Sequence, residues 1–413
     1  MRQMKDSGAN WIGKIPGNWK SDKLKYHLTR KEPKNPGDMT VLSLYRELGI
    51  IPKDSRDDNH NQTSEDTSKY KYVKPGNFVV NKMKAWQGSV AVSEYEGIVS
   101  PAYYVYEFTD NVFNKRYFHH LLRGCYKDEF MRLSGGMRVG QWDLSSEDLG
   151  NTLVLIPPLD EQKKIADFLD AKCIEIDNLI ADIEKQIESL EQYKRSTIAE
   201  AVTKGLNPKA ELKDSGFEWL GEIPSHWKLT RIANLYRVRN QKVSDKDFPP
   251  LSVTMKGIVP QLETAAKTND GDNRKLVRVG DFAINSRSDR RGSCGISAFD
   301  GSVSLINTVL KPMSEMNPRY YNWLFHTVQF ADEYYKHGHG IVDDLWTTTW
   351  QEMRKIVIPT PPLDEQEIIA NYLDEKCSKI DDCIAEKKEQ IETLQTYKKS
   401  LIFEYVTGKK EVV

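Results

Sequence analysis

The chain contains one plan twice, and this internal duplication limits its fold more than any other feature. Residues 6–20 return as residues 214–228 with 9 of 15 positions identical, and residues 157–203 return as residues 361–407 with 27 of 47 identical. Short-period solenoids repeat every ~20 to 50 residues, so a repeat of this length indicates a different architecture. The sequence predicts two related halves and an approximate twofold axis within one chain.

The stretches between the matched blocks keep the same frame but carry different side chains. At a constant shift, backbone-setting positions agree, as in Gly88 with Gly292 and Gly136 with Gly340. The segment at 82–87 reads Lys-Met-Lys-Ala-Trp-Gln, whereas its counterpart at 286–291 reads Ser-Arg-Ser-Asp-Arg-Arg. This pattern is typical of two related modules that recognise different targets.

The best-matched segments predict long helices with an apolar seam. Spacings of three and four residues, which are typical of a coiled coil, separate Cys173, Ile176, Ile180, Ile183, Ile187 and Leu190 in the first copy and Cys377, Ile380, Ile384, Lys387, Ile391 and Leu394 in the second. A helix over residues 160–203 is ~66 Å long and must bury its stripe, most simply on its own repeat. A twofold axis makes that pair antiparallel, so Cys173 and Cys377 should lie apart and form no disulfide.

The remaining parts predict α+β domains. Short β-rich runs at 41–44, 78–81, 90–92 and 103–106, and at 281–285 and 295–299, alternate with turn residues, and residues 114–132 and 318–336 are typical of helices. Pro-Pro pairs end the preceding strands, and Asp160 or Asp364 can cap the helix that follows. We therefore expect two α+β domains, 1–156 and 207–360, each followed by a helical region, 157–206 and 361–413.

Composition and charge set weaker limits. The 413 residues are 29% charged and 39% hydrophobic, and no apolar run approaches the ~18 residues of a membrane span. The N-terminal segment lacks the apolar core of a signal peptide, and the five cysteines form no C-x-x-C pair, so we expect a reducing, cytoplasmic setting without a disulfide framework. The net charge is −1, but the segments 228–360 and 20–156 carry +5 and +2, whereas 160–205 carries −4. The basic excess thus lies in the variable parts.

Together these features resemble the DNA-specificity subunit of type I restriction-modification enzymes. The resemblance is carried by the two Pro-Pro-Leu-Asp-Glu-Gln openings at 157–162 and 361–366, by the Gln-x-x-x-Leu-x-x-Tyr-Lys tracts at 186–194 and 390–398, and by the Trp-Leu-Gly-Glu-Ile-Pro-x-x-Trp-Lys block at 219–228. It covers essentially the whole chain. One small departure is that Thr203-Lys204-Gly205 becomes Thr407-Gly408-Lys409.

The resemblance implies a noncatalytic subunit that reads a split target on double-stranded DNA. Each target-recognition domain would read one half, the helices would fix the spacing, and partners, two methyltransferase subunits and the restriction (helicase-nuclease) subunits, would supply adenine methylation and ATP-dependent cleavage. The sequence agrees with this division, because it has neither an Asn/Asp-Pro-Pro-aromatic tetrapeptide nor a Walker-type Gly-Lys-Ser/Thr loop. We expect no cofactor, no metal and no membrane partner.

Three catalytic or metal-binding interpretations have weaker support in the sequence. Glu386-Lys387-Lys388 suggests a nuclease pattern but lies on the predicted coiled coil. Asp160 and Glu161 have the side chains of a general acid and base but open a helix. His337, His339, Asp343 and Asp344 have metal-ligand chemistry without a fixed helical spacing or a third histidine.

The candidate DNA contacts lie in loops that differ between the matched frames. In the loop 135–142, Arg138 and Gln141 have the side chains that make bidentate contacts to guanine and adenine, and its counterpart 337–344 contains His339. Cationic side chains that suit phosphate or base contacts follow the strands ending at 81 and 285: Lys82, Lys84, Arg287, Arg290 and Arg291.

Two other functions stay open at this point. One is a noncatalytic scaffold whose paired globular domains bind proteins; the other is the specificity subunit of a fused restriction-methylation enzyme. Salt-sensitive binding to DNA with a bipartite preference separates a reader from a scaffold. Neighbouring genes for a methyltransferase and a helicase-nuclease separate a multi-subunit system from a fused enzyme.

Overall fold

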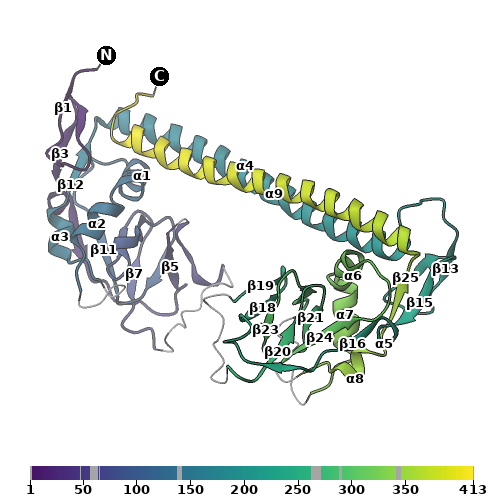
Figure 1. The fold of residues 1–413 in the computed structure, drawn as a ribbon. Coiled ribbons are helices and arrows are strands. Elements are labelled where there is room, and N and C mark those ends of the chain that lie inside the picture. Colours follow the sequence, from purple (N-terminus) through teal and green to yellow (C-terminus); the bar gives the residue numbers. More distant parts are fainter. Residues whose placement is uncertain are drawn as a thin grey trace. The chain divides into compact units, whose positions relative to one another are not determined.

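The computed structural model describes residues 2–46, 48–55, 64, 66–136, 142–261, 271–287, 291–340 and 346–412. The chain forms two compact units, the first from residues 1–183 with 389–413 and the second from residues 184–388. Each unit therefore contains one α+β part and a portion of both long helices, α4 (Leu159–Lys204) and α9 (Leu363–Val406) (Figure 1). The expected α+β class with paired long helices is confirmed, while the four-part division by sequence boundaries stays a prediction.

An antiparallel four-stranded sheet forms the centre of the first unit. Its order is β4 (Leu28–Lys31), β11 (Tyr103–Phe108), β8 (Phe78–Asn81) and β9 (Val90–Val92). Short antiparallel pairs surround it: β1 (Met4–Asp6) with β2 (Lys14–Pro16), β3 (Lys20–Lys23) with β12 (Leu153–Ile156), β5 (Leu42–Tyr45) with β6 (Gly49–Pro52), and β7 (Lys71–Val73) with β10 (Gly97–Val99). The helices are α1 (Lys115–Cys125), α2 (Lys127–Leu133) and α3 (Ser146–Asn151), with single turns η1 (Leu24–Tyr26), η2 (Lys53–Ser55) and η3 (Ala85–Gln87).

The second unit repeats this sheet in the same order. Its strands are β16 (Tyr236–Val238), β24 (Asn307–Pro312), β21 (Phe282–Asn285) and β22 (Cys294–Ile296). Around it lie β13 (Leu212–Asp214) with β14 (Glu222–Pro224), β15 (Lys228–Arg231) with β25 (Val357–Thr360), β18 (Leu251–Thr254) with β19 (Gly257–Pro260), and a three-stranded sheet of β17 (Lys242–Val243), β20 (Arg274–Val277) and β23 (Gly301–Val303). The helices are α5 (Ile232–Leu235), α6 (Pro318–Phe325), α7 (Val328–Lys336) and α8 (Trp350–Met353).

The sequence predicts one helix where each unit has two. The predicted helix at 114–132 is divided into α1 and α2 at Tyr126, and the predicted helix at 318–336 is divided into α6 and α7. In the second unit Thr327 is extended (ψ 148°), and its side chain accepts a hydrogen bond from Phe330 N. A threonine N-cap stabilises a new helix start, so the second helix begins afresh there.

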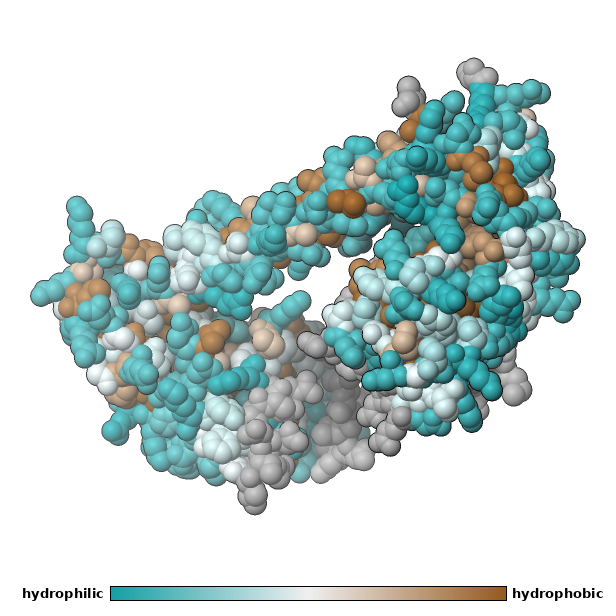
Figure 2. All heavy atoms as spheres, turned by 180° about the vertical axis from the view of Figure 1, so that it is seen from behind, coloured by the Kyte–Doolittle hydropathy of each residue, from teal (hydrophilic) through white to brown (hydrophobic). Residues whose placement is uncertain are grey.

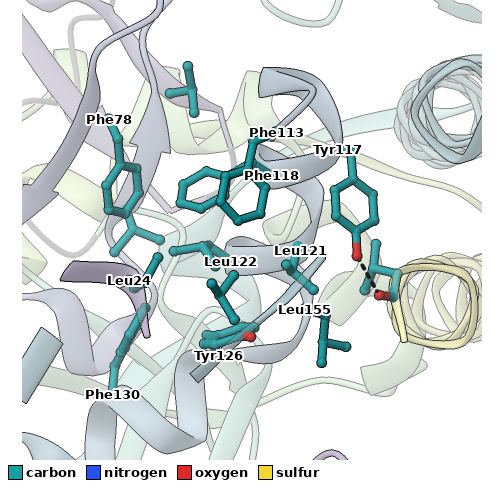
Figure 3. Packing of buried hydrophobic residues seen from close by; sticks show 14 of the residues in the cluster. Leu24, Phe78, Phe113, Tyr117, Phe118, Leu121, Leu122, Tyr126, Phe130 and Leu155 are labelled. Atoms are coloured by element: carbon teal, nitrogen blue, oxygen red, sulfur yellow. Dashed lines mark hydrogen bonds between the residues drawn. The ribbon is translucent and has the colours of Figure 1, made fainter. Parts of the chain in front are cut away.

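Aromatic and leucine side chains of α1 and α2 fill the core of the first unit. Phe118, Leu121 and Tyr126 are fully buried and pack towards strand residues such as Phe78 and Leu155 (Figure 3). Burial of a side chain of this size contributes ~1.5 to 3 kcal/mol. This core fixes the position of the sheet against the long helices.

Each unit also anchors the end of one long helix through a tyrosine. The Tyr117 hydroxyl donates to the carbonyl of Val406 in α9 (3.0 Å; Figure 3), and the Tyr320 hydroxyl donates to the carbonyl of Val202 in α4 (2.9 Å). The last carbonyls of a helix have no partner within the helix. The two tyrosines therefore satisfy equivalent carbonyls, which lie one repeat apart.

The long helices pair antiparallel within each unit. In the first unit Asp177 accepts from Lys398 (2.6 Å) and Phe168 lies against Tyr405, so residue numbers rise along one helix and fall along the other. In the second unit Lys194 donates to the repeat-equivalent Asp381, again at 2.6 Å. The twelve predicted seam residues are all buried or half-buried, which confirms the coiled-coil seam.

The Pro-Pro-Leu-Asp-Glu-Gln motif joins each α+β part to its helix. Glu161 accepts the indole N–H of Trp19 (3.0 Å), and Glu365 accepts that of Trp227 (2.9 Å). The first backbone bond of α4 runs from Gln162 N to the carbonyl of Pro158. Asp160 thus lies in the first turn of α4 and not at its N-cap, which corrects the capping role expected from the sequence.

Candidate nucleic-acid interface

A turn after β8 and the base of the loop 135–143 form one local frame in the first unit. The Asn81 side chain accepts from Met83 N (3.2 Å), which turns the chain directly after the strand. Gly135 and Asp143 form an antiparallel bridge that closes the loop, and Leu144 N donates to the carbonyl of Lys82 (3.0 Å). The structure therefore brings together the two segments in which the sequence places its candidates.

The second unit contains the same frame at equivalent positions. The Asn285 side chain accepts from Arg287 N (3.0 Å), and Thr348 N donates to the carbonyl of Ser286 (3.0 Å). His339 and Thr347 form the bridge that closes the loop 339–347. Two sequences with few identities here thus maintain one backbone arrangement and vary the side chains that it presents.

The candidate cations of the first unit differ in their surroundings. Lys82 pairs with Asp143 at 3.0 Å, and this hydrogen bond raises the pKa of Lys82. Lys84 is exposed just before η3. Asp143 thus offsets one positive charge at the loop base, and Lys84 presents another to solvent.

The candidates of the second unit lie beside an aromatic stack. The Arg291 guanidinium lies 4.5 Å from the ring centre of Tyr335 and pairs with Asp332 (2.7 Å). Tyr335 stacks on Trp346 with ring centres 5.5 Å apart. Arg287 and His339 are exposed on the same frame. Three candidates, Arg138, Gln141 and Arg290, lie outside the described residues.

Sequence reasoning missed a basic and aromatic group on the first unit's sheet. The Arg30 guanidinium lies 4.3 Å from the ring centre of Tyr104, and Lys71 lies 6.0 Å from the same ring. Both cations also pair with Glu32. Strand pairing of β4 with β11 brings Arg30 to Tyr104, and Lys71 comes from β7. This register is not readable from the sequence, although the basic and aromatic residue types are visible.

The rejected alternatives have structural explanations. Glu161 bonds Trp19, and His337 pairs with Glu333 at 3.2 Å. Glu386 and Lys388 are exposed on α9. Within the described ranges no group of three metal-ligand side chains comes together, although Asp343 and Asp344 are not among them.

No helix in the part of the chain that the structure describes is long and apolar enough to cross a membrane.

Comparisons with known proteins point to one family. Residues 26–192 match the family described as the type I restriction modification DNA specificity domain. A protein of Methanocaldococcus jannaschii named as the MjaX type I restriction enzyme specificity subunit is 25% identical, with 97% of this chain and 96% of that protein aligned. The EcoBI specificity subunit of Escherichia coli is 32% identical over 31% of this chain and 27% of its own length.

Solved structures share the fold. A chain from a type I R-M system structure superposes with a TM-score of 0.72 at 16% identity, covering 96% of this chain and 99% of that one. The HsdS subunit from Thermoanaerobacter tengcongensis superposes with a TM-score of 0.52 at 17% identity, covering 96% and 98%.

Proposed function

We propose that this chain, which belongs to the DNA-specificity subunits of type I restriction-modification systems, reads a bipartite site in double-stranded DNA with one half-site for each unit. A subunit of this family is a noncatalytic DNA-recognition protein. The proposal concerns how this chain divides that recognition between its two repeats. We define the reading surface of each unit as its candidate loop, 135–143 or 339–347, together with the turn after β8 or β21.

The duplicated loop frame is the observation that carries this proposal. In the turn after β8 and the turn after β21, an asparagine side chain accepts an equivalent backbone N–H, but one turn presents Lys82 and Lys84 and the other Arg287 and Arg291. Cationic side chains neutralise phosphates, and arginine also forms bidentate bonds to guanine. A constant frame with different side chains suits two readers of different half-sites.

The long helices supply the spacing in this proposal. Both helices pass from one unit into the other, so their length limits the distance between the two reading surfaces. Half-sites read from one side of a duplex lie about one helical turn apart, ~34 to 36 Å between centres. We expect an unspecified gap between the two half-sites.

Symmetric apolar residues on the helices suit two copies of a partner. Leu159 and Leu363 are one repeat apart and 52% and 45% exposed, and Tyr193 and Tyr397 are 49% and 53% exposed. On the face seen in Figure 2, scattered hydrophobic residues lie among hydrophilic ones along the helices. We expect two methyltransferase subunits per chain, with restriction subunits joining that complex. Mass measurement at saturating methyltransferase should give two copies, and a stable one-to-one complex would contradict this stoichiometry.

Mapping of methylated adenines tests the proposed function. DNA from cells that carry the chain with its partner subunits should contain a bipartite motif methylated in both halves. The same cells without this chain should lose methylation of that motif and regain it on complementation. An unchanged methylation pattern would reject the assignment.

A further inference from the structure

The second unit contains a small cavity inside the candidate reading frame. The cavity has a volume of about 20 Å³ and lies between the end of β21, helix α7 and the base of the loop 339–347. Phe325, Phe330 and Ala331 contribute apolar surface to it, and Arg287 and Arg291 also line it. Both arginines are exposed. A cavity so placed has apolar walls beside groups that suit contact with DNA.

Two hydroxyl groups of the cavity wall already donate hydrogen bonds within the unit. The Ser286 hydroxyl donates to the carbonyl of Ile306 (2.5 Å), and the Thr348 hydroxyl donates to the carbonyl of Tyr334 (2.8 Å). A buried water needs ~2 to 4 polar partners. Because the protons of both hydroxyls are used elsewhere and much of the remaining wall is apolar, the cavity favours an apolar group of about the size of one methyl.

The aromatic stack holds the cavity wall in place. Tyr335 and Trp346 both line it, and the Trp346 indole N–H donates to the carbonyl of Tyr335 (2.9 Å). Arg291 covers the Tyr335 ring. A stacked pair with a fixed hydrogen bond loses little further conformational entropy when a ligand binds, so the cavity is formed before contact with DNA.

Unmodified DNA presents one suitable apolar group in its major groove, the C5 methyl of thymine. We propose that this cavity receives the C5 methyl of a thymine in the half-site that the second unit reads, while Arg287 and Arg291 contact neighbouring phosphates or base edges. This inference rests on the proposed function and adds a specific base to it. It predicts at least one thymine, on either strand, in that half-site.

The first unit has different side chains at the matching positions. Met83 and Gln87 stand one repeat before Arg287 and Arg291. Trp142, the counterpart of Trp346, packs against Trp86 with ring centres 5.6 Å apart. The proposed methyl contact therefore belongs to the second half-site, and the first half-site serves as an internal control.

Replacing thymine by uracil removes only the methyl group and tests the contact directly. With the full chain, in the complex in which it is purified, uracil at one thymine of the second half-site should weaken binding about fourfold. This change corresponds to the ~0.8 kcal/mol of one buried methyl-sized group. The position of the methyl group should matter. In the duplex with uracil, neither 5-methylcytosine at another position nor N6-methyladenine in the half-site should restore the binding that the thymine methyl provides.

Filling the cavity assigns the effect to this site. Ala331→Leu should remove the discrimination between thymine and uracil and keep the preference for the first half-site. The matched control is Gln329→Leu, which adds a leucine to the exposed face of the same helix and should leave the discrimination intact. Retained preference for the other bases of the second half-site shows that the second unit of each variant is folded.

The outcomes separate this inference from the function on which it rests. If binding stays bipartite but uracil at every thymine of the second half-site changes nothing, or that half-site has no thymine, the methyl contact is wrong and the reader function stands. Discrimination that survives Ala331→Leu also overturns the contact. If the chain has no sequence preference at all, both proposals fail.

Discussion

Gln162 and Gln366 show at the scale of single residues why the repeated motif is retained in both halves. Each is buried, and its side-chain amide donates to a proline carbonyl, of Pro157 or Pro361, at 2.8 Å. Each also accepts the backbone N–H of an N-cap residue, Asn114 at α1 (2.7 Å) or Asn317 at α6 (2.9 Å). One side chain thus joins the long helix to the α+β part of its unit.

Replacing Gln366 by alanine should lower the free energy of unfolding of the second unit by ~1 to 3 kcal/mol, because it leaves a buried N–H and carbonyl without partners. Chemical denaturation followed by tryptophan fluorescence measures the change. Glu367→Ala, at the exposed neighbouring position, is the control and should change stability by less than about 0.5 kcal/mol. Equal effects of the two substitutions would contradict this role.

His119 should make the first unit sensitive to acid. Its Nδ1 accepts from Val92 N (3.3 Å), and burial lowers the pKa of His119 to about 3. The unfolded chain, with a histidine pKa of ~6.5, then binds a proton that the folded unit does not. The contribution to stability is therefore complete above pH ~6.5 and is lost as the pH falls towards 3, by up to ~1.4 kcal/mol per pH unit.

The test compares urea unfolding of the chain and of His119→Asn between pH 6.5 and 4.5. Asparagine keeps an acceptor near Val92 N but does not titrate, so the variant should show a shallower loss of stability on acidification. Parallel pH profiles for the two proteins would show that His119 is not the group responsible.

At the scale of elements, the periodic patterns were the most predictable. The seam of α4 and α9, and the strands β8 and β9, lie where the sequence placed them, because repeated apolar spacing records which face is buried. The division into α1 and α2, and into α6 and α7, was not predicted. The Thr327 side chain competes with backbone carbonyls for the N–H of Phe330, and apolar spacing does not reveal such a cap.

The candidate site was predictable only in part for a related reason. The sequence indicated which loops differ between the copies, and the frame brings the turn at Lys82 to the loop base at Asp143. The Arg30 and Tyr104 pair, and the cavity beside Trp346, depend on strand register and on packing between elements far apart in sequence. Which loop side chains contact bases stays a prediction.

The close packing of α1 on α9 gives a prediction for one glycine. A Cβ at Gly124 would lie 2.4 Å from Cγ2 of Ile402. Gly124→Ala should therefore destabilise the first unit, although alanine favours helix by ~1 kcal/mol relative to glycine. In a double-mutant cycle, Gly124→Ala should lower the free energy of unfolding by less when Ile402 is already replaced by alanine. Additive effects of the two substitutions, measured by chemical denaturation, would argue against the contact.

At the scale of the whole molecule, the duplication predicts most of the architecture. Both units use the same sheet order, the same tryptophan-to-glutamate bond and the same tyrosine anchor. The equivalent ion pairs Asp177 with Lys398 and Asp381 with Lys194 follow from an antiparallel pair of repeated helices. A long internal repeat is informative because each half constrains the interpretation of the other.

The proposed spacing role of the helices predicts the effect of lengthening both. Four residues inserted after Leu190 and four after Leu394 add ~6 Å at 1.5 Å per residue, nearly two base pairs at ~3.4 Å each. We expect unchanged half-sites separated by a longer unspecified gap, as measured by methylation mapping. The original gap with full activity would mean that the helices do not set the distance.

Selection of bound duplexes from a random pool tests whether one chain reads two half-sites with its two units. The full chain, in the complex in which it is purified, should enrich two short specific blocks separated by an unspecified gap of fixed length. The paired substitutions Arg287→Ala and Arg291→Ala should weaken or alter the second block and leave the first intact. Enrichment of one uninterrupted block, or of no sequence, would show that the chain does not read a bipartite site. An equal change in both blocks would show that the two units do not read separate half-sites.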